Sequence, residues 1–247
     1  MTRRIRLAIF APALAGFAAL LYWGLVGLPS FGDYRGPYGF VLNRVALPER
    51  HTTNVVAATV FDYRGFDTMG EELILFSAVV GVVLLLRGSA ENGDADAVAA
   101  STGSDALRVV GTLMVGGAVL VGLWLVAFGY ITPGGGFQGG IVIASGAILL
   151  YFSASHRAFE RLGSEALLDP IEAIGAGGYV VVGLAALVSG LPFLGNLLGP
   201  GIPGTLSSGG SIPFLNWASG LEVAGANLIL FSEFLKEYVV PLARKQA

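Results

Sequence analysis

The fold is decided by the apolar segment 107–128, which reads LRVVGTLMVGGAVLVGLWLVAF and carries a single charge, on Arg108. An α-helix rises about 1.5 Å per residue, so a segment of this length crosses the hydrocarbon core of a bilayer, which is about 30 Å thick. A helix on the surface of a soluble protein keeps one polar face, and this segment has none. It therefore predicts a transmembrane helix.

The rest of the chain repeats this pattern. Further candidate spans lie at 5–26, 67–86, 135–153, 171–191 and 214–240. Hydrophobic residues make up 54% of the chain and charged residues only 13%, against about 25% in soluble domains. We expect an all-α integral membrane protein with about six transmembrane helices. The short apolar stretch 51–61 predicts an interfacial helix after the first span, and residues 33–50 are expected to form a loop.

The spans divide into two groups. Residues 88–103 are rich in Gly, Ala, Asp and Ser, which predicts a flexible cytoplasmic linker between a two-span unit, 1–87, and a four-span unit, 104–247. With the N-terminus in the cytoplasm, all but four of the 14 Lys and Arg residues lie inside. This predicts a multi-pass plasma-membrane protein with both termini inside. The first span also has features of a signal peptide, but it is long and no clear cleavage site follows it.

Several classes of function are excluded. The chain has no cysteine, and His51 and His156 are far apart, so no metal or cofactor site is expected. The net charge of −3 and the lack of a basic tract argue against nucleic acid as a partner. No nucleophile–base constellation is present, so we expect no catalytic site.

The densest polar cluster is the stretch DYRGFDTMGEE at 62–72. Charges at membrane depth are costly unless they are paired or hydrated. One interpretation is therefore a hydrated ion site formed by Asp62, Arg64, Asp67 and Glu71. The other is a polar turn, with Thr68 and Glu71 as a capping box and Asp62 paired with Arg64. Residue types alone leave both interpretations open.

A second candidate is Glu222, near the middle of the last span. It has no basic partner nearby in sequence, and an unpaired carboxyl at this depth indicates an ion path, although a neutral glutamic acid at a subunit interface is the alternative. Glu233 is different, because Lys236 is placed to pair with it. Asp169 and Glu172 fit ordinary helix-start chemistry, with Asp169 as the N-cap.

The third motif is the stretch TPGGGFQGG at 132–140. No Lys-Ser/Thr follows the glycines, so the motif is not a phosphate-binding P-loop. A tight turn that opens a closely packed helix explains it better. The residues expected to pack there are Gly134, Gly135, Gly136, Gln138, Gly139 and Gly140.

Two of these motifs resemble those of a known family. The stretch NVVAATVFDYRGFDTMGE, 54–71, resembles a D-[FY]-R-G-[FL]-D-T-x-G-E signature found at the C-terminal end of the MrpA subunit of Mrp-type antiporters and in the MbhE subunit of membrane-bound hydrogenases. The stretch PGGGFQGG, 133–140, resembles the core of the MnhB/MrpB domain. The chain thus looks like an MbhE-like unit fused to a MnhB/MrpB domain.

The resemblance implies an accessory membrane subunit of a multisubunit Na⁺/H⁺ antiporter or of an Mrp-like, complex I-like module. Its expected partners are antiporter subunits of the A and D type, small subunits of the C, E, F and G type, and a redox module in some assemblies. Two departures bear on proton transfer: Tyr130 replaces a family histidine, and the stretch 216–223 lacks the family's aspartate before its glycine. Alternatives are a scaffold subunit that conducts nothing and an autonomous transporter, which the absence of an inverted repeat disfavours.

Overall fold

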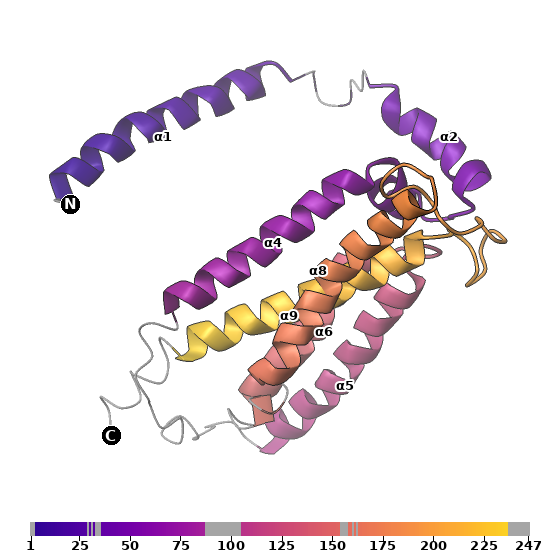
Figure 1. The fold of residues 1–247 in the computed structure, drawn as a ribbon. Helices are drawn as coiled ribbons and strands as arrows, with labels where there is room; N and C mark the ends of the chain where they lie inside the picture. Colours follow the sequence, from indigo (N-terminus) through magenta and orange to yellow (C-terminus); the bar gives the residue numbers. More distant parts are fainter. Residues whose placement is uncertain are drawn as a thin grey trace. The chain divides into compact units, whose positions relative to one another are not determined.

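We describe the protein from a computed structural model. It describes residues 3–28, 30, 32, 36–86, 105–153, 158–159, 161 and 163–236, and the predicted linker lies outside them. The helices in this part of the chain are α1 (Arg3–Val26), α2 (Tyr38–Arg50), α3 (Val55–Ala58), the π-helix η1 (Thr59–Tyr63), α4 (Gly65–Leu86), α5 (Asp105–Phe128), α6 (Gly136–Ser153), α8 (Glu165–Val188) and α9 (Ile212–Phe234) (Figure 1). All regular structure among the described residues is helical, as predicted.

Six of these helices are long and apolar enough to cross a membrane, which confirms the predicted class. The candidate spans are Leu7–Val26, Gly65–Leu86, Arg108–Phe128, Gly136–Ser153, Ala166–Val188 and Ile212–Phe234. The loop predicted at 33–50 is wrong, because Tyr38–Arg50 is helical. The short helix expected at 51–61 is present as α3 and η1.

Residues 1–41 form a compact unit of their own, and residues 42–247 form another. In the first unit, the described side chains of α1 are exposed along the whole helix. A helix that is apolar on every side needs lipid or protein around it, so α1 has the surface of a membrane helix.

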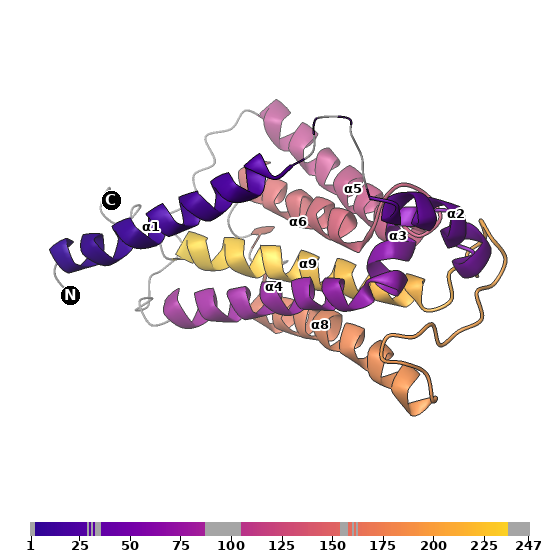
Figure 2. The same cartoon turned by 90° about the horizontal axis from the view of Figure 1, so that it is seen from above.

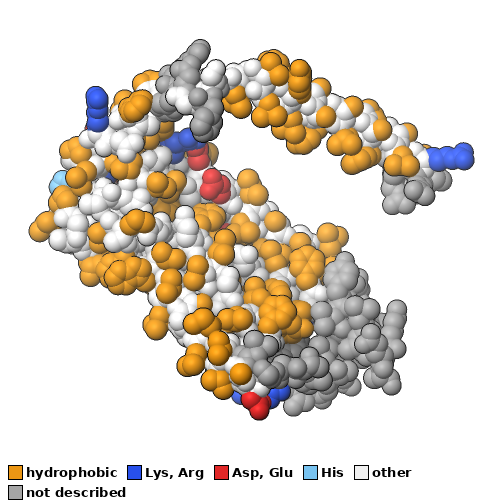
Figure 3. Space-filling model, turned by 180° about the vertical axis from the view of Figure 1, so that it is seen from behind, with side chains coloured by type: hydrophobic (Ala, Val, Ile, Leu, Met, Phe, Trp, Pro, Cys, Tyr) orange, Lys and Arg blue, Asp and Glu red, His pale blue; other side chains and the backbone are white. Residues whose placement is uncertain are grey.

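The second unit is a bundle of α4, α5, α6, α8 and α9. Helix α9 is its central element and contacts each of the other four (Figures 1 and 2). In Figure 2, α5 and α6 lie on one side of α9, and α4 and α8 lie on the other. Hydrophobic side chains are spread along the visible face of the bundle, as on a surface in contact with lipid (Figure 3).

Glycines allow these helices to approach one another. A Cβ on Gly139 of α6 would lie 2.6 Å from the Gly122 carbonyl oxygen of α5, and a Cβ on Gly140 would lie 2.8 Å from the Gly220 carbonyl oxygen of α9. A Cβ on Gly136 would be closer still to α9, at 2.3 Å from the Asn216 carbonyl oxygen. Close backbone contact of this kind is how membrane helices gain packing energy without a hydrophobic driving force between them.

Candidate functional site

The polar cluster lies where α2, η1 and α4 meet, and its ion pairs differ from the predicted ones. Asp62 accepts a hydrogen bond from Arg50 Nε at 2.5 Å and one from Asn196 Nδ2 at 3.3 Å. The predicted pair of Asp62 and Arg64 is therefore wrong. Arg64 instead donates to Asp67 Oδ2 at 2.6 Å, within the first turn of α4. The sequence did not suggest Arg50 as the partner of Asp62, because residues 33–50 were expected to form a loop.

The Arg50–Asp62 pair is reinforced by its surroundings. The Arg50 guanidinium lies 4.9 Å from the centre of the Tyr63 ring, and the Tyr63 hydroxyl donates to Glu49 at 2.7 Å. Burial, followed by that hydrogen bond, raises the pKa of Tyr63 to about 12. Burial lowers the pKa of Arg50, but the hydrogen bond and the charge of Asp62 outweigh it, so the net shift is upward. Arg50 and Asp62 are therefore a fixed ion pair.

The predicted capping box at Thr68 and Glu71 is also wrong. Helix α4 begins at Gly65, so Thr68 lies inside its first turn, and its hydroxyl donates to the Val60 carbonyl at 2.7 Å. That bond ties α4 to the preceding π-helix. Glu71 is left exposed on the helix surface.

Hydrogen bonds hold the long loop 192–211 against this end of the bundle. Asn196 bonds to Asp62, accepts from the Ser211 amide at 2.9 Å, and donates to the Gly209 carbonyl at 3.2 Å. Tyr130 is buried and donates to the Leu206 carbonyl at 2.7 Å. Burial raises the pKa of Tyr130, so its phenol stays neutral and acts as a fixed hydrogen-bond donor.

The glycine motif is held by two asparagines. Fully buried Asn216 of α9 accepts from the Gly136 amide at 2.6 Å and donates to the Val126 carbonyl at 2.5 Å, which links α9 to α5 and α6. Asn54, at the start of the first motif, donates to the Gly129 carbonyl at 2.6 Å and to the Thr132 carbonyl at 3.1 Å. The two motifs are therefore in direct contact.

Between them lies a cavity of about 180 Å³. Its polar lining comes from Glu71 and Thr68 of α4 and from Gln138 of α6. The remaining lining residues are Val56, Ala57, Val60, Phe61, Gly134, Gly135, Gly136 and Phe137. Of the predicted ion-path residues, only Glu71 lines this cavity; Asp62, Arg64 and Asp67 do not.

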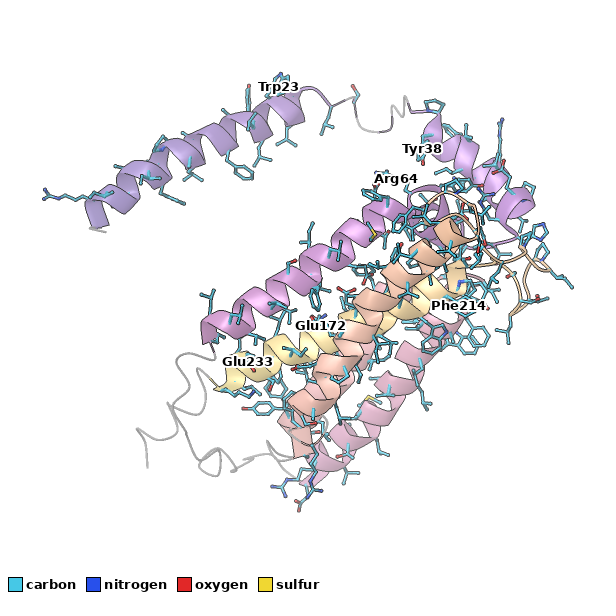
Figure 4. The ribbon with its side chains drawn as sticks, in the orientation of Figure 1. Trp23, Tyr38, Arg64, Glu172, Phe214 and Glu233 are labelled. Atoms are coloured by element: carbon cyan, nitrogen blue, oxygen red, sulfur yellow. The ribbon has the colours of Figure 1, made fainter. Side chains whose placement is uncertain are left out.

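Deeper in the bundle, three carboxyl side chains from three helices come together. Glu72 of α4 is 1% exposed, Glu172 of α8 is 5% exposed, and Glu222 of α9 is 0% exposed. The Glu72 carboxyl lies beside the Glu222 carboxyl and the Ser219 hydroxyl, and Glu172 is close enough to Glu222 for their charges to interact. Figure 4 shows Glu172 inside the bundle, between the end marked by Arg64 and the end marked by Glu233.

The polar atoms of this cluster lack hydrogen-bond partners of normal geometry. Among the described residues, this holds for both carboxyl oxygens of Glu72 and of Glu222, for Oε1 of Glu172 and for the Ser219 hydroxyl. Glu233, further along α9, differs, because Lys236 Nζ lies 2.9 Å from its Oε1, as predicted. Burying a polar group without a partner costs about 1–3 kcal/mol, and burying an isolated charge costs much more. Burial of these groups therefore lowers the stability of the folded protein, which indicates that they serve a function.

Sequence reasoning found Glu222 but gave Glu172 a different role. The expected helix start at Asp169 is wrong, because α8 begins at Glu165 and Asp169 lies inside it. Glu72 was noticed only as part of the polar cluster. Adjacent residues on a helix point about 100° apart, so Glu71 and Glu72 face different surroundings. This difference in direction was the feature of the sequence from which the inward position of Glu72 could have been inferred.

The chain is similar to proteins of a known family. Residues 106–229 match the family model described as a domain related to the MnhB subunit of Na⁺/H⁺ antiporters. The chain belongs to this family. The MnhB match spans α5 to α9 and so includes Glu172, Glu222 and the glycine motif, while Glu72 lies before it.

Relatives of the MnhB-family chain occur in both archaea and bacteria. An uncharacterized protein of Methanocaldococcus jannaschii is 32% identical, and the match covers 77% of this chain and 80% of that protein. The probable K⁺/H⁺ antiporter A/B subunit of Rhizobium meliloti is 28% identical over 60% of this chain, but the match covers only 17% of that much longer protein.

Solved structures show the same fold. A chain of the membrane-bound sulfane sulfur reductase, an archaeal respiratory membrane complex, superposes with a TM-score of 0.67 at 31% identity, covering 95% of this chain and 99% of that one. A chain of the Mrp complex from Dietzia sp. gives a TM-score of 0.70 at 21% identity, covering 96% of this chain and 27% of that one.

Proposed function

We propose that this chain is an accessory membrane subunit of a multisubunit Mrp-type module that moves Na⁺ or H⁺, and that its buried carboxyls form part of the ion path. The observation that carries the proposal is the convergence of Glu72, Glu172 and Glu222, all nearly inaccessible, inside a helical bundle. A subunit that only fills space between larger subunits gains nothing from such groups. Intramembrane carboxyls of this kind are typical of ion and proton pathways.

The glycine contacts favour an additional packing role. They fix α5, α6 and α9 at short separations, and the bundle exposes many large hydrophobic side chains that neighbours could cover. The partners we propose are antiporter subunits of the A and D type and the small subunits that accompany them. We place the chain in the plasma membrane with both termini inside, as the distribution of Lys and Arg favours.

The sequence identities favour a respiratory type of assembly. The chain is 31% identical to the sulfane sulfur reductase chain, against 21% for the Mrp complex chain and 28% for the antiporter A/B subunit. In an assembly of that type a redox module supplies the energy, and this subunit contributes to the membrane arm. Transport by other subunits alone, with this chain as a scaffold, is the alternative that the glycine contacts support.

We propose that ions reach the carboxyls from the cavity between the two motifs. Glu71 lines that cavity, and the next residue, Glu72, belongs to the buried cluster. Asp62, Arg64 and Asp67 lie at the same end of the bundle, where the charges of Arg64 and Asp67 are about half exposed. These groups would act at the mouth of the path, by electrostatic attraction.

The test uses the intact complex in proteoliposomes, with cation-dependent proton flux as the measurement. Glu222→Gln removes the central carboxyl at nearly constant volume. Its matched control is Glu233→Gln, the same change on the same helix at a residue paired with Lys236. We expect flux to fall about tenfold or more with Glu222→Gln and to stay near wild type with Glu233→Gln. Equal flux in both variants, at equal assembly, would favour the scaffold role.

A further inference from the structure

Glu72 and Glu222 form a facing pair that joins the two parts of the sequence on either side of the predicted linker. Glu72 comes from α4, and Glu222 comes from α9, 150 positions later. Resting on the proposed function, we propose that this pair, with Ser219, is a proton-binding site in which two carboxyls share one proton, and that it does not bind a metal cation.

The charge balance of the surroundings requires such a proton. Two ionised carboxylates side by side in a medium of low dielectric repel each other strongly, so one of the two keeps its proton, as in other buried carboxyl pairs. Among the residues that the structure describes, every titratable group that acts on the pair is also an acid. These groups are Glu71 of α4 and Glu172 and Tyr179 of α8. Among the described residues, no ion pair with a basic side chain reaches Glu72 or Glu222.

Ser219 completes the site. It is 0% exposed, it precedes Glu222 by one helical turn, and its hydroxyl lies beside the Glu72 carboxyl. The hydroxyl has no hydrogen-bond partner within the described part of the chain. It can donate a hydrogen bond to whichever carboxyl is ionised, while the protonated carboxyl donates to its partner. A hydroxyl donor suits an anionic oxygen that changes its protonation state.

The same geometry disfavours a metal ion. In the described ranges, no group of three or more His, Cys, Asp and Glu side chains is placed to hold one. Hard cations such as Ca²⁺ and Mg²⁺ take about six or more oxygen ligands, and carboxyls that bind them must be ionised. Glu172 is near Glu222 but does not complete such a set. A proton needs only one carboxyl and one acceptor, which the pair supplies.

Glycine contacts fix one member of the pair, Glu222, relative to Glu172 of α8. On α8, Gly175 contacts the Glu222 backbone, and Gly225 of α9 contacts the Glu172 backbone, with a Cβ at Gly225 only 3.0 Å from the Glu172 amide nitrogen. Glu222 and Glu172 are therefore carried by two helices, α9 and α8, whose separation is set by glycine.

The experiment is infrared difference spectroscopy on the purified intact complex at neutral pH. A protonated carboxyl has a C=O stretching band, distinct from carboxylate bands, that shifts in D₂O. We expect this acid band in the difference spectra between wild type and Glu72→Gln and between wild type and Glu222→Gln. The matched control, Glu233→Gln, is expected to show only carboxylate bands, because Glu233 pairs with Lys236.

Wild type alone provides a second measurement that does not depend on how well a variant assembles. Raising NaCl at constant pH is expected to leave the acid band unchanged. Loss of the band on addition of Na⁺, or its absence from both glutamine spectra, would overturn the shared proton. Ser219→Ala provides a milder perturbation, for which we expect a shift of the band.

The spectra separate this inference from the proposed function. If Glu222→Gln stops ion flux but no acid band is present, the ion path stands and the shared proton is wrong. If the acid band behaves as expected but flux is unchanged, the proton site stands and the transport role of the cluster is wrong.

Discussion

Gly175 of α8 lies so close to Glu222 of α9 that a Cβ on Gly175 would be 2.3 Å from the Glu222 amide nitrogen. Atoms at that separation overlap, and the obstructing atoms are backbone. The glycine therefore sets how closely α8 approaches the helix that carries the central carboxyl. The position of Glu222 relative to Glu172 depends on this contact.

Gly175→Ala is expected to force α8 and α9 apart. Overpacking of a close contact costs about 1–3 kcal/mol, and here it also displaces a candidate ion-path residue. The matched control is Gly177→Ala, because a Cβ there meets no atom within 4 Å. We expect the first variant to lower the thermal midpoint of the purified complex and the second to leave it within error. Equal midpoints would show that the α8–α9 contact tolerates a methyl group.

Asn216→Ala is expected to weaken the junction of α5, α6 and α9. It removes the acceptor of the Gly136 amide and the donor to the Val126 carbonyl, and it leaves both of those groups buried without a partner. We therefore expect the free energy of unfolding to fall by about 1–3 kcal/mol. Asn227→Ala is the control, because among the described residues the Asn227 side chain bonds within its own helix, to the Val223 carbonyl. Chemical unfolding of the complex in detergent compares the two; a similar loss in both would contradict the assigned role of Asn216.

Bulky replacements test the packing role of the glycine motif. Gly139→Leu places a large side chain against the Gly122 carbonyl, where even a Cβ would be 2.6 Å away. We expect the complex to lose this subunit, or to fail to assemble, as judged by co-purification. Gly116→Leu is the control, since a Cβ at Gly116 meets nothing within 4 Å of it in this chain. Normal co-purification of Gly139→Leu would mean that the α5–α6 contact is unimportant for assembly.

The two aspartates of the polar cluster are expected to behave differently. Asp62→Asn removes the charge that pairs with Arg50. Because this pair is partly exposed, we expect the free energy of unfolding to fall by about 1 kcal/mol. Asp67→Asn alters an exposed pair with Arg64 and should change stability by less than about 0.5 kcal/mol. Thermal midpoints of the purified complexes measure both. If Asp67→Asn is the more destabilising change, the roles assigned to the two pairs are reversed.

Much of the fold could be predicted from the sequence. The spans are long apolar runs, and the requirement that backbone groups be satisfied inside a bilayer leaves helices as the natural structure for them. Boundaries were harder to predict where polar residues occur inside helices. Asp169 and Pro170 resemble a helix start, yet α8 begins at Glu165 and contains both residues.

Only part of the candidate site, Glu222, could be predicted from the sequence. Glu222 stands out because it is alone in an apolar run. Glu72 does not, because it follows Glu71 in a polar stretch, and only the packing of α4 against α9 shows that it turns inward. The partners of Asp62 were equally hidden, since Arg50 and Asn196 reach it from distant segments. Contacts between helices are set by tertiary packing, which one sequence does not display.

The central claim is that the buried carboxyls carry ions, and Glu72→Gln tests it most directly. Glu72 lies outside the region matched to the MnhB family, on a helix from the other side of the predicted linker. The measurement is the initial rate of cation-dependent proton flux in proteoliposomes that contain equal amounts of assembled complex. The account predicts a fall of about tenfold or more, as with Glu222→Gln. A rate equal to that of wild type, with the complex intact, would contradict it.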